Sequence, residues 1–499
     1  MFTKIINKIK GVLYRMRIIK GVELQQKVDI PVDQSFYDEI ARWRCWYRGF
    51  YKEFHETWHS VQGIKRSRRL LTLGMAKQVA QEMANMICNE KMEVSCDNEA
   101  VSAFIDPILE ANGFIDTTQE NAEYMMAVGG MVAEVFSDRN NIKVSYVPAE
   151  NFIPLSWDVN KKIDQAIIVV EQTKKKDFTY TLLRSHLKKE DGDRTIYYIV
   201  NELYRSSVND STLGQPVDLS IIYPGLEPYI EFPNAKRPFF AYCKPSVANN
   251  IDSDTPLGIS IFANAIDTLK TIDTVFDSFQ REFKLGKKRV VVPNSWLRGS
   301  VERSEDGKSR IVTKFDIDDE VFQAMEMDEN KEQFMDISPE LRTQEHISSL
   351  DALLKTLSAQ TGFSANTFGF EATGLKTATE VVSENSKTFR SKQSNENNIG
   401  VFTAEVVESI LWLADFLGLH SYPTEEYNVT SSFDDSIVND KDAKINQQIA
   451  LKGAGLQSRK RAIMESQGVD DTTALEILEE IAKDEQIVTA GMVDAFGVE

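Results

Sequence analysis

The sharpest catalytic pattern in this chain is His55-Glu56-Thr57-Trp58-His59, which has the spacing of a zinc-binding HExxH motif. On a helix, this spacing places both imidazoles on one face, where they can bind zinc, and the glutamate acts as a general base. A zinc hydrolase also needs a third ligand, and Glu82 lies at a suitable distance downstream. Glu53 disfavours this interpretation, because helices with the motif are usually apolar there. A zinc-dependent hydrolase is therefore one alternative function.

The residues around the motif favour a structural role instead. Between Ser35 and Ser60, aromatic side chains recur at helical spacing, which is typical of the core-facing side of a helix. On such a helix the two histidines and the glutamate fall on the solvent side without binding a metal. We therefore expect no catalytic residue, no metal and no cofactor. The aromatic residues are Trp43, Trp46, Tyr47, Phe50, Tyr51, Phe54 and Trp58.

Composition excludes several other classes of protein. The 499 residues are 42% hydrophobic, enough for a large core, and the net charge is −19. Tight binding of nucleic acid over the whole surface needs many cations, so only local contacts fit this charge. No GxxxxGK[ST] phosphate loop occurs. The cysteines, Cys45, Cys88, Cys96 and Cys243, lack CxxC spacing, which predicts no disulfide and fits a reducing cytosol.

The first twenty residues predict a basic amphipathic helix, in which apolar residues alternate with lysines and arginines. The charges interrupt every apolar run, which excludes a signal peptide. Two interpretations stay open: a helix on a membrane surface, or a helix packed on the protein body or on a neighbouring chain. We expect the second.

Hydrophobic periodicity predicts helices over 66–90 and 100–128, a strand over 131–136, and then a series of antiparallel strands. We expect a proline-rich strap from Tyr223 to Pro245 to be extended and irregular. The strands of the series are predicted at 143–147, 165–172, 179–186, 195–204 and 217–223.

The most regular stretch of the chain is a long helix predicted from Leu257 to Arg289. Its apolar residues repeat at steps of three and four, and Asp267, Asp273 and Asp277 lie on its other faces. The helix therefore packs against protein. Strands at 289–292, 310–315 and 321–325 follow, with Asp306-Gly307 as a turn.

A second helix of the same spacing is predicted from Ser338 to Gly362. A glycine-containing loop follows, and a capping box of Thr377 and Glu380 then opens a helix that reaches Leu417 and kinks near Gly400.

This order of elements resembles that of portal proteins of long-tailed bacteriophages. The resemblance is carried by TPLGISIFANAIDTLKTIDTVFDSF, LDALLKTLSAQTGF and GLKTATEV, with LKGAGLQSRKRAI near the end. It implies an α+β fold with a wing of helices and antiparallel sheet, a helical stem, a small α/β clip, a tunnel loop and a helical crown. The implied boundaries are 1–256 (wing with the N-terminal helix), 257–285 and 338–361 (stem), 286–337 (clip), 362–376 (tunnel loop), 377–436 (long kinked helix and return to the wing) and 437–499 (crown).

The resemblance implies a homo-oligomeric ring, usually of twelve subunits, at one capsid vertex. Double-stranded DNA passes through such a ring during packaging and ejection. The implied partners are the terminase large subunit, a head-tail adaptor, and the major capsid and scaffolding proteins, with no small-molecule substrate. The implied location is the virion, with assembly in the host cytoplasm. A nonviral ring-forming scaffold is a further alternative.

Three sets of residues are the candidates for these contacts. The tunnel loop around the DNA comprises Phe363, Asn366, Phe368, Gly369, Phe370, Glu371, Gly374 and Lys376. The stem contacts between subunits comprise Phe262, Leu269, Ile272, Phe276, Phe279, Phe283, Leu350, Leu354 and Leu357. The docking surface of the clip comprises Lys287, Lys288, Arg289 and Asp306.

Overall fold

A computed structural model shows the chain as two compact units, residues 1–373 with 385–432, and residues 374–384 with 433–499. It describes residues 32–61, 64–88, 92–138, 141–192, 194–208, 213–286, 290–293, 300–303, 309–312, 322–325, 335–336, 340–370, 386–433, 448–467, 473–475 and 477–483. The predicted helix of the first twenty residues lies outside this part of the chain.

The helical layer of the first unit begins with α2 (Gln34–Tyr47), whose N-terminus is capped by the Asp33 side chain. The short α3 (Lys52–His55) follows, and then strands β1 (Glu56–Val61) and β2 (Ile64–Arg69) form a hairpin. The helix predicted through Ser60 is therefore wrong beyond His55. The helix predicted over 66–90 is α4 (Met75–Cys88), which starts later because β2 occupies its first residues.

Helices α5 (Glu99–Ala111) and α6 (Phe114–Val128) confirm the predicted helical pair. Helix α6 packs against α4 and α2, and its buried residues include Ala122 and Met126. After it, Gly129 adopts a φ of +91°, and a Cβ atom there would lie 2.6 Å from the Gly258 carbonyl oxygen. A glycine is therefore required where the two backbones cross, and this crossing positions the segment that leads into α7.

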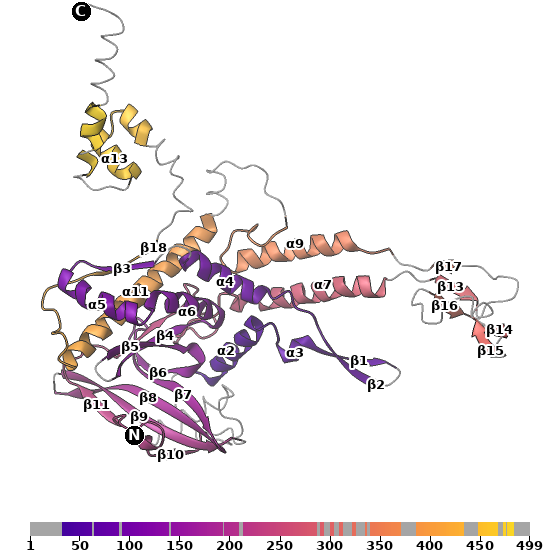
Figure 1. Ribbon diagram of the computed structural model, residues 1–499, viewed down its shortest axis with the longest axis horizontal. Coiled ribbons are helices and arrows are strands. Elements are labelled where there is room, and N and C mark those ends of the chain that lie inside the picture. Colours follow the sequence, from indigo (N-terminus) through magenta and orange to yellow (C-terminus); the bar gives the residue numbers. More distant parts are fainter. Residues whose placement is uncertain are drawn as a thin grey trace, which may run out of the picture. The chain divides into compact units, whose positions relative to one another are not determined.

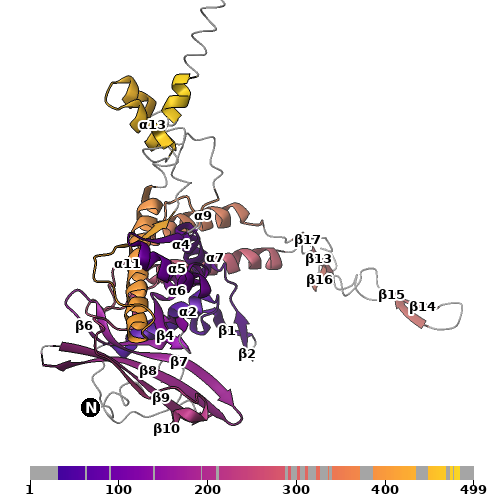
Figure 2. The same ribbon diagram turned by 60° about the vertical axis from the view of Figure 1, so that its left-hand side comes forward.

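The long strands form a six-stranded sheet with the order β10-β9-β8-β7-β6, in which β11 also pairs with β9. Strands β7, β8 and β9 confirm the predicted antiparallel series and form an outer layer (Figures 1 and 2). The strand predicted over 217–223 is mainly the short helix η2 (Leu219–Ile221). The bounds are β6 (Phe152–Trp157), β7 (Ile163–Lys175), β8 (Phe178–Asp191), β9 (Arg194–Ser207), β10 (Gln215–Val217) and β11 (Tyr229–Phe232).

A second sheet, of order β12-β4-β5, lies between the long strands and the helices. It comprises β4 (Met131–Asp138), β5 (Asn141–Pro148) and β12 (Phe240–Cys243). The strap predicted to be irregular therefore contributes two strands, β11 and β12. Helix α11 (Ser386–Phe416) packs on this sheet and buries Ile399, Phe402 and Val406. Its bounds include residues 391–400, the predicted position of a kink, and its end at Phe416 agrees with the prediction that the helix reaches Leu417.

Two helices, α7 (Ile266–Leu285) and α9 (Thr343–Gln360), pack side by side (Figures 1 and 2). The predicted start of the first helix is corrected, because Phe262 precedes the short helix η3 (Ala263–Ala265). Gly362, in the left-handed conformation at φ +85°, follows the second helix as predicted. We call α7 and α9 the helix pair.

The described residues between the two helices of the pair include five short strands. Strand β13 (Val290–Pro293) pairs with β16 (Phe322–Met325) and β17 (Met335–Asp336), and β14 (Ser300–Arg303) pairs with β15 (Ser309–Val312). They confirm the three strands predicted here and add β14 and β17. The predicted turn at Asp306 and the N-cap at Ser338 lie outside the described residues.

The remaining elements return the chain to the first unit and then form the second. Strand β18 (Val429–Phe433) pairs with β3 (Met92–Cys96). The described residues of the second unit are mostly helical and include α13 (Arg459–Gln467). The fold is thus a mixture of helices and antiparallel sheet, which confirms the predicted α+β class.

Candidate functional site

The candidate zinc motif does not lie on one helix. His55 ends α3, whereas Glu56 begins β1 and His59 lies within it, so the helical spacing that zinc binding needs is absent. His55 is fully buried rather than solvent-facing. Among the described residues, no group of three or more His, Cys, Asp or Glu side chains could hold a metal ion.

Both ring nitrogens of His55 have partners within the protein. The backbone N–H of Tyr51 donates to Nδ1 at 2.8 Å, so the proton is on Nε2, which donates to the Asp273 carboxylate at 3.0 Å. No lone pair is left for a metal. His55 therefore joins α3 to α7, and the expectation of a solvent-side histidine is corrected.

We predict that His55→Ala lowers the free energy of unfolding by about 2–4 kcal/mol, because it leaves the buried Asp273 carboxylate without this partner. Urea denaturation measures this loss. Metal analysis should find no stoichiometric zinc in the parent protein, in His55→Ala or in His59→Ala. Stoichiometric zinc that His55→Ala removes would restore the hydrolase interpretation.

Asp273 belongs to a pair of buried carboxylates one turn apart on α7 that hold the segment after the hairpin. Asp273 also accepts from the Leu73 backbone N–H at 2.8 Å, and Asp277 accepts from that of Leu71 at 3.1 Å. Arg68 of β2 binds Asp277 through two bonds of 2.6 and 2.7 Å. These bonds lower the pKa of Asp277 below its usual range. We call Asp273 and Asp277 the aspartate clamp.

Six of the nine residues predicted to make stem contacts between subunits are buried inside this chain. They are Phe262, Leu269, Ile272, Leu350, Leu354 and Leu357. Their hydrophobic surface is covered by the chain's own elements, so a neighbouring subunit cannot reach them. Phe276 and Phe279 are half-buried, and Phe283 is 48% exposed. Only these three remain for contact with a neighbour.

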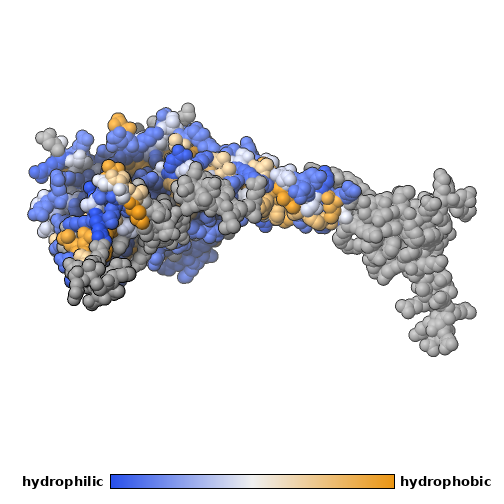
Figure 3. All heavy atoms as spheres, turned by 90° about the horizontal axis from the view of Figure 1, so that it is seen from above, coloured by the Kyte–Doolittle hydropathy of each residue, from blue (hydrophilic) through white to orange (hydrophobic). Residues whose placement is uncertain are grey.

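The end of the helix pair next to the short strands exposes three large apolar side chains. Phe283 is joined there by Leu341 and Ile347, which are 41% and 38% exposed. We call these three residues the distal apolar face; Figure 3 shows hydrophobic side chains along this part of the molecule. Beside it, Arg342 binds Glu282 and lowers the pKa of that carboxyl group to about 2. The ion pair links α7 to the residue that precedes α9.

The described part of the predicted tunnel loop, residues 362–370, is anchored at both ends. Phe363 is fully buried against Phe368, with ring centroids 5.0 Å apart. The backbone N–H of Ser364 donates to Thr388 of α11, and that of Phe370 donates to Asp351 of α9. Phe363 is therefore a core residue, and its assignment to a DNA channel is corrected.

The remaining tunnel-loop candidates differ in solvent exposure. Asn366 is exposed, Gly369 is half-buried, and Phe370 is 60% exposed. Glu371, Gly374 and Lys376 lie outside the described residues, as do the clip candidates Lys287, Lys288, Arg289 and Asp306.

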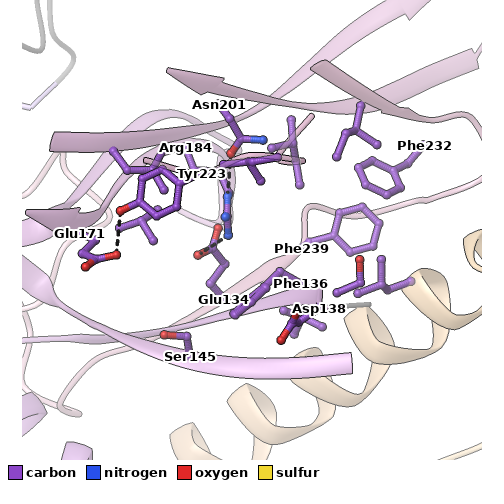
Figure 4. A pocket seen from close by; sticks show the side chains of 18 of the residues that line it. Glu134, Phe136, Asp138, Ser145, Glu171, Arg184, Asn201, Tyr223, Phe232 and Phe239 are labelled. Atoms are coloured by element: carbon purple, nitrogen blue, oxygen red, sulfur yellow. Dashed lines mark hydrogen bonds and ion pairs between the residues drawn. The ribbon is translucent and has the colours of Figure 1, made fainter. Parts of the chain in front are cut away.

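A cavity of about 410 Å³ lies between the six-stranded sheet, β4 and the end of α11 (Figure 4). Glu134 of β4 is buried at its wall, within 3.0 Å of Arg184 and 2.8 Å of His186 of β8. Burial alone would raise the pKa of Glu134, but Arg184 and His186 outweigh this and lower it. Arg184 also donates to Asn201 of β9 at 2.9 Å. This network joins the two sheets.

The buried charged residues described above join elements of the fold to one another. Buried charges hold elements together, and the exposed apolar residues lie on the helix pair. Residues 26–487 match the family described as phage portal protein, SPP1 Gp6-like. The chain belongs to this phage portal family. A search of curated proteins finds no match.

Membership of this family confirms that the chain is a phage portal protein, as the sequence predicted. Phage portal proteins are structural components of the virion capsid and are associated with an oligomeric ring. In the part of the chain that the structure describes, none of the helices has the length and apolar character needed to cross a membrane.

The sequence did not predict the contacts that hold the hairpin on α7. These contacts involve Arg68, the aspartate clamp and the hairpin itself. Glu56 to Val61 had a usable signal, because the run contains Thr, Trp and Val and precedes Gly63, a composition typical of a strand and turn. No sequence signal could identify the partners of the aspartates, because Arg68 and Asp277 are 209 residues apart.

Proposed function

We propose that this chain forms the closed ring at one vertex of a long-tailed phage capsid that conducts double-stranded DNA during packaging and ejection. The observation that carries the proposal is the distal apolar face on a helix pair of a portal-family protein. In a monomer, Phe283, Leu341 and Ile347 remain in contact with water, which does not stabilise the fold. Neighbouring copies in a ring can bury these side chains.

The proposed parts follow the order of the chain. Residues 1–256 form the wing, 257–285 and 338–361 the stem, 286–337 the clip, 362–376 the tunnel loop, 377–436 the long helix and return to the wing, and 437–499 the crown. Twelve subunits, terminase and head-tail adaptor docking at the clip, contacts with major capsid and scaffolding proteins, and assembly in the host cytoplasm belong to the same proposal.

The negative charge of the chain suits a conduit. A net charge of −19 per subunit repels phosphates, so the ring does not gain the counterion-release affinity that would hold DNA in place. DNA can then slide.

Electron microscopy of the purified protein tests the proposal. We expect closed rings with a central channel wide enough for a DNA duplex. A monodisperse monomer, or a filament that does not close, would contradict it.

We predict that Lys376→Ala and a loop shortened between Gly369 and Gly374 alter DNA packaging or retention without affecting ring assembly. Lys376 is the only base from 363 to 376, so each subunit offers the duplex one phosphate contact there. A packaging assay with rings checked by microscopy measures both effects.

Charge reversal at Lys287, Lys288 and Arg289 is the contrasting change. It should weaken docking of terminase or adaptor while the packaged DNA is retained normally. If both changes in the tunnel loop package DNA at the normal rate, the loop is a passive connector.

A further inference from the structure

The β1–β2 hairpin of the first unit has exposed residues to which the proposed ring assigns no role. Among the described strands, it pairs only with itself, as a two-stranded sheet. Isolated two-stranded hairpins are marginally stable in water, so something else must hold it. Arg68 and the segment that follows β2 are held by the aspartate clamp on α7. The hairpin is therefore fixed at its base.

One face of the hairpin is turned away from the chain's own helix. Thr57 pairs with Arg68, and Trp58 pairs with Ser67. Because successive residues of a strand point to opposite faces, Trp58 lies on the face opposite to Arg68, which binds α7. Trp58 is 65% exposed, the largest exposed fraction among the described aromatic residues. Helix α7 of the same chain therefore cannot cover it.

A second aromatic ring and a cation lie on the same face as Trp58. Arg69 shares that face by the strand alternation, and its guanidinium lies 5.0 Å from the centroid of Phe50, which is 38% exposed. We call Phe50, Trp58 and Arg69 the arm face. Exposed tryptophan, arginine and a neighbouring aromatic ring are the residue types that dominate the energetics of protein–protein interfaces.

The charge of the hairpin identifies its partner. Residues 56–69 contain four basic residues and one acid, a net charge of +3, so the rest of the chain carries −19 − 3 = −22. A basic arm on a strongly acidic protein is complementary to the body of another copy. At the distal apolar face, the exposed Glu340 and Glu345 flank Leu341 and Ile347 and offer carboxylates to the arm, and the exposed Arg281, Lys284 and Arg342 lie at the same end.

We propose that the hairpin is an intersubunit arm: in the ring, the arm face of one subunit docks on the distal apolar face of its neighbour. The proposal rests on the proposed ring. Each copy carries one arm face and one distal apolar face, so the contact is heterologous and continues from subunit to subunit until the ring closes. The rigid base lowers the conformational entropy lost on docking.

The contact is tested with a photo-crosslinking amino acid at position 58. Subunits labelled with ¹⁴N and ¹⁵N are mixed before assembly, and the rings are irradiated and analysed by mass spectrometry. We expect cross-links between light and heavy peptides that join position 58 to residues 340–347 or 276–284. The same probe at Val159, which is 97% exposed, is the control and should give no such cross-link.

Each outcome decides the proposal. Rings that cross-link from position 58 only within one chain, to co-purified DNA or to another protein overturn the arm and leave the ring intact. A protein that remains monomeric overturns both the ring and the arm.

A thermodynamic variant gives independent evidence. Trp58→Ala should raise the concentration at which half of the chains are in rings by about 10-fold or more, and Trp58→Phe should recover part of the loss. Phe178→Ala, at a phenylalanine that is 39% exposed on β8, is the matched control and should leave this concentration unchanged. An unchanged midpoint for Trp58→Ala would overturn the arm.

Discussion

Phe283→Asp is expected to prevent ring assembly and leave a folded monomer. Phe283 is 48% exposed in the single chain, so the substitution costs the monomer little. In the proposed ring, the same position is buried against a neighbour, where an unpaired carboxylate carries a large desolvation penalty. The penalty is repeated at every contact around the ring. Light scattering and electron microscopy should therefore show monomers in place of rings.

Phe283 is a sharper site for this test than Phe276 or Phe279. Phe279 is half-buried and lies 5.5 Å from the ring of His346 on α9, so a charge there would also disturb the helix pair. Phe178→Asp is the matched control, because it makes the same change at a 39% exposed phenylalanine of the six-stranded sheet. Circular dichroism should show both variants folded. Rings of Phe283→Asp with normal stability would remove the distal apolar face from the subunit contact.

The order of the elements could be predicted because each long segment has one dominant period. The apolar residues of α7 and α9 repeat every three to four residues, and buried and more exposed residues alternate along β9. The hairpin could not be assigned in the same way. Trp58 continues the helical spacing of the preceding aromatic residues and also fits an alternating strand, so the period is ambiguous there. The competing β composition of Thr57 to Val61 decided the outcome.

The candidate site was predicted less well, for a physical reason. The spacing places Asp273 and Asp277 outside the apolar seam of α7 but does not show that they are buried, because a buried carboxylate needs partners that the spacing does not identify. Their partners, His55 and Arg68, are more than 200 residues away in the chain, and periodicity carries no information about such pairs. The same limit applies to the seam of α7: spacing shows that a face is apolar but not whether the same chain or a neighbour covers it.

Glu134→Ala is expected to cause the largest loss of stability in the sheets. The change leaves Arg184, which is buried, without the carboxylate that lies 3.0 Å away. Removing one partner of a buried ion pair costs about 3–5 kcal/mol, because the remaining charge stays desolvated. Urea denaturation should show this loss. The matched control is Glu171→Ala, at an exposed carboxylate that lines the same cavity, which should cost less than about 1 kcal/mol.

The pH dependence of this loss follows from the pKa of Glu134, which the folded protein holds below the usual value of 4.5. A carboxyl group with a depressed pKa contributes stability that is fully present above the unfolded value and is lost as the pH falls through the folded value. The difference in unfolding free energy between the parent and Glu134→Gln should therefore shrink as the pH falls below about 5. Other carboxylates titrate equally in both proteins and cancel in this difference. If the difference instead grows as the pH falls, the buried glutamate is protonated in the folded chain. Arg184 and His186 would then not keep Glu134 charged.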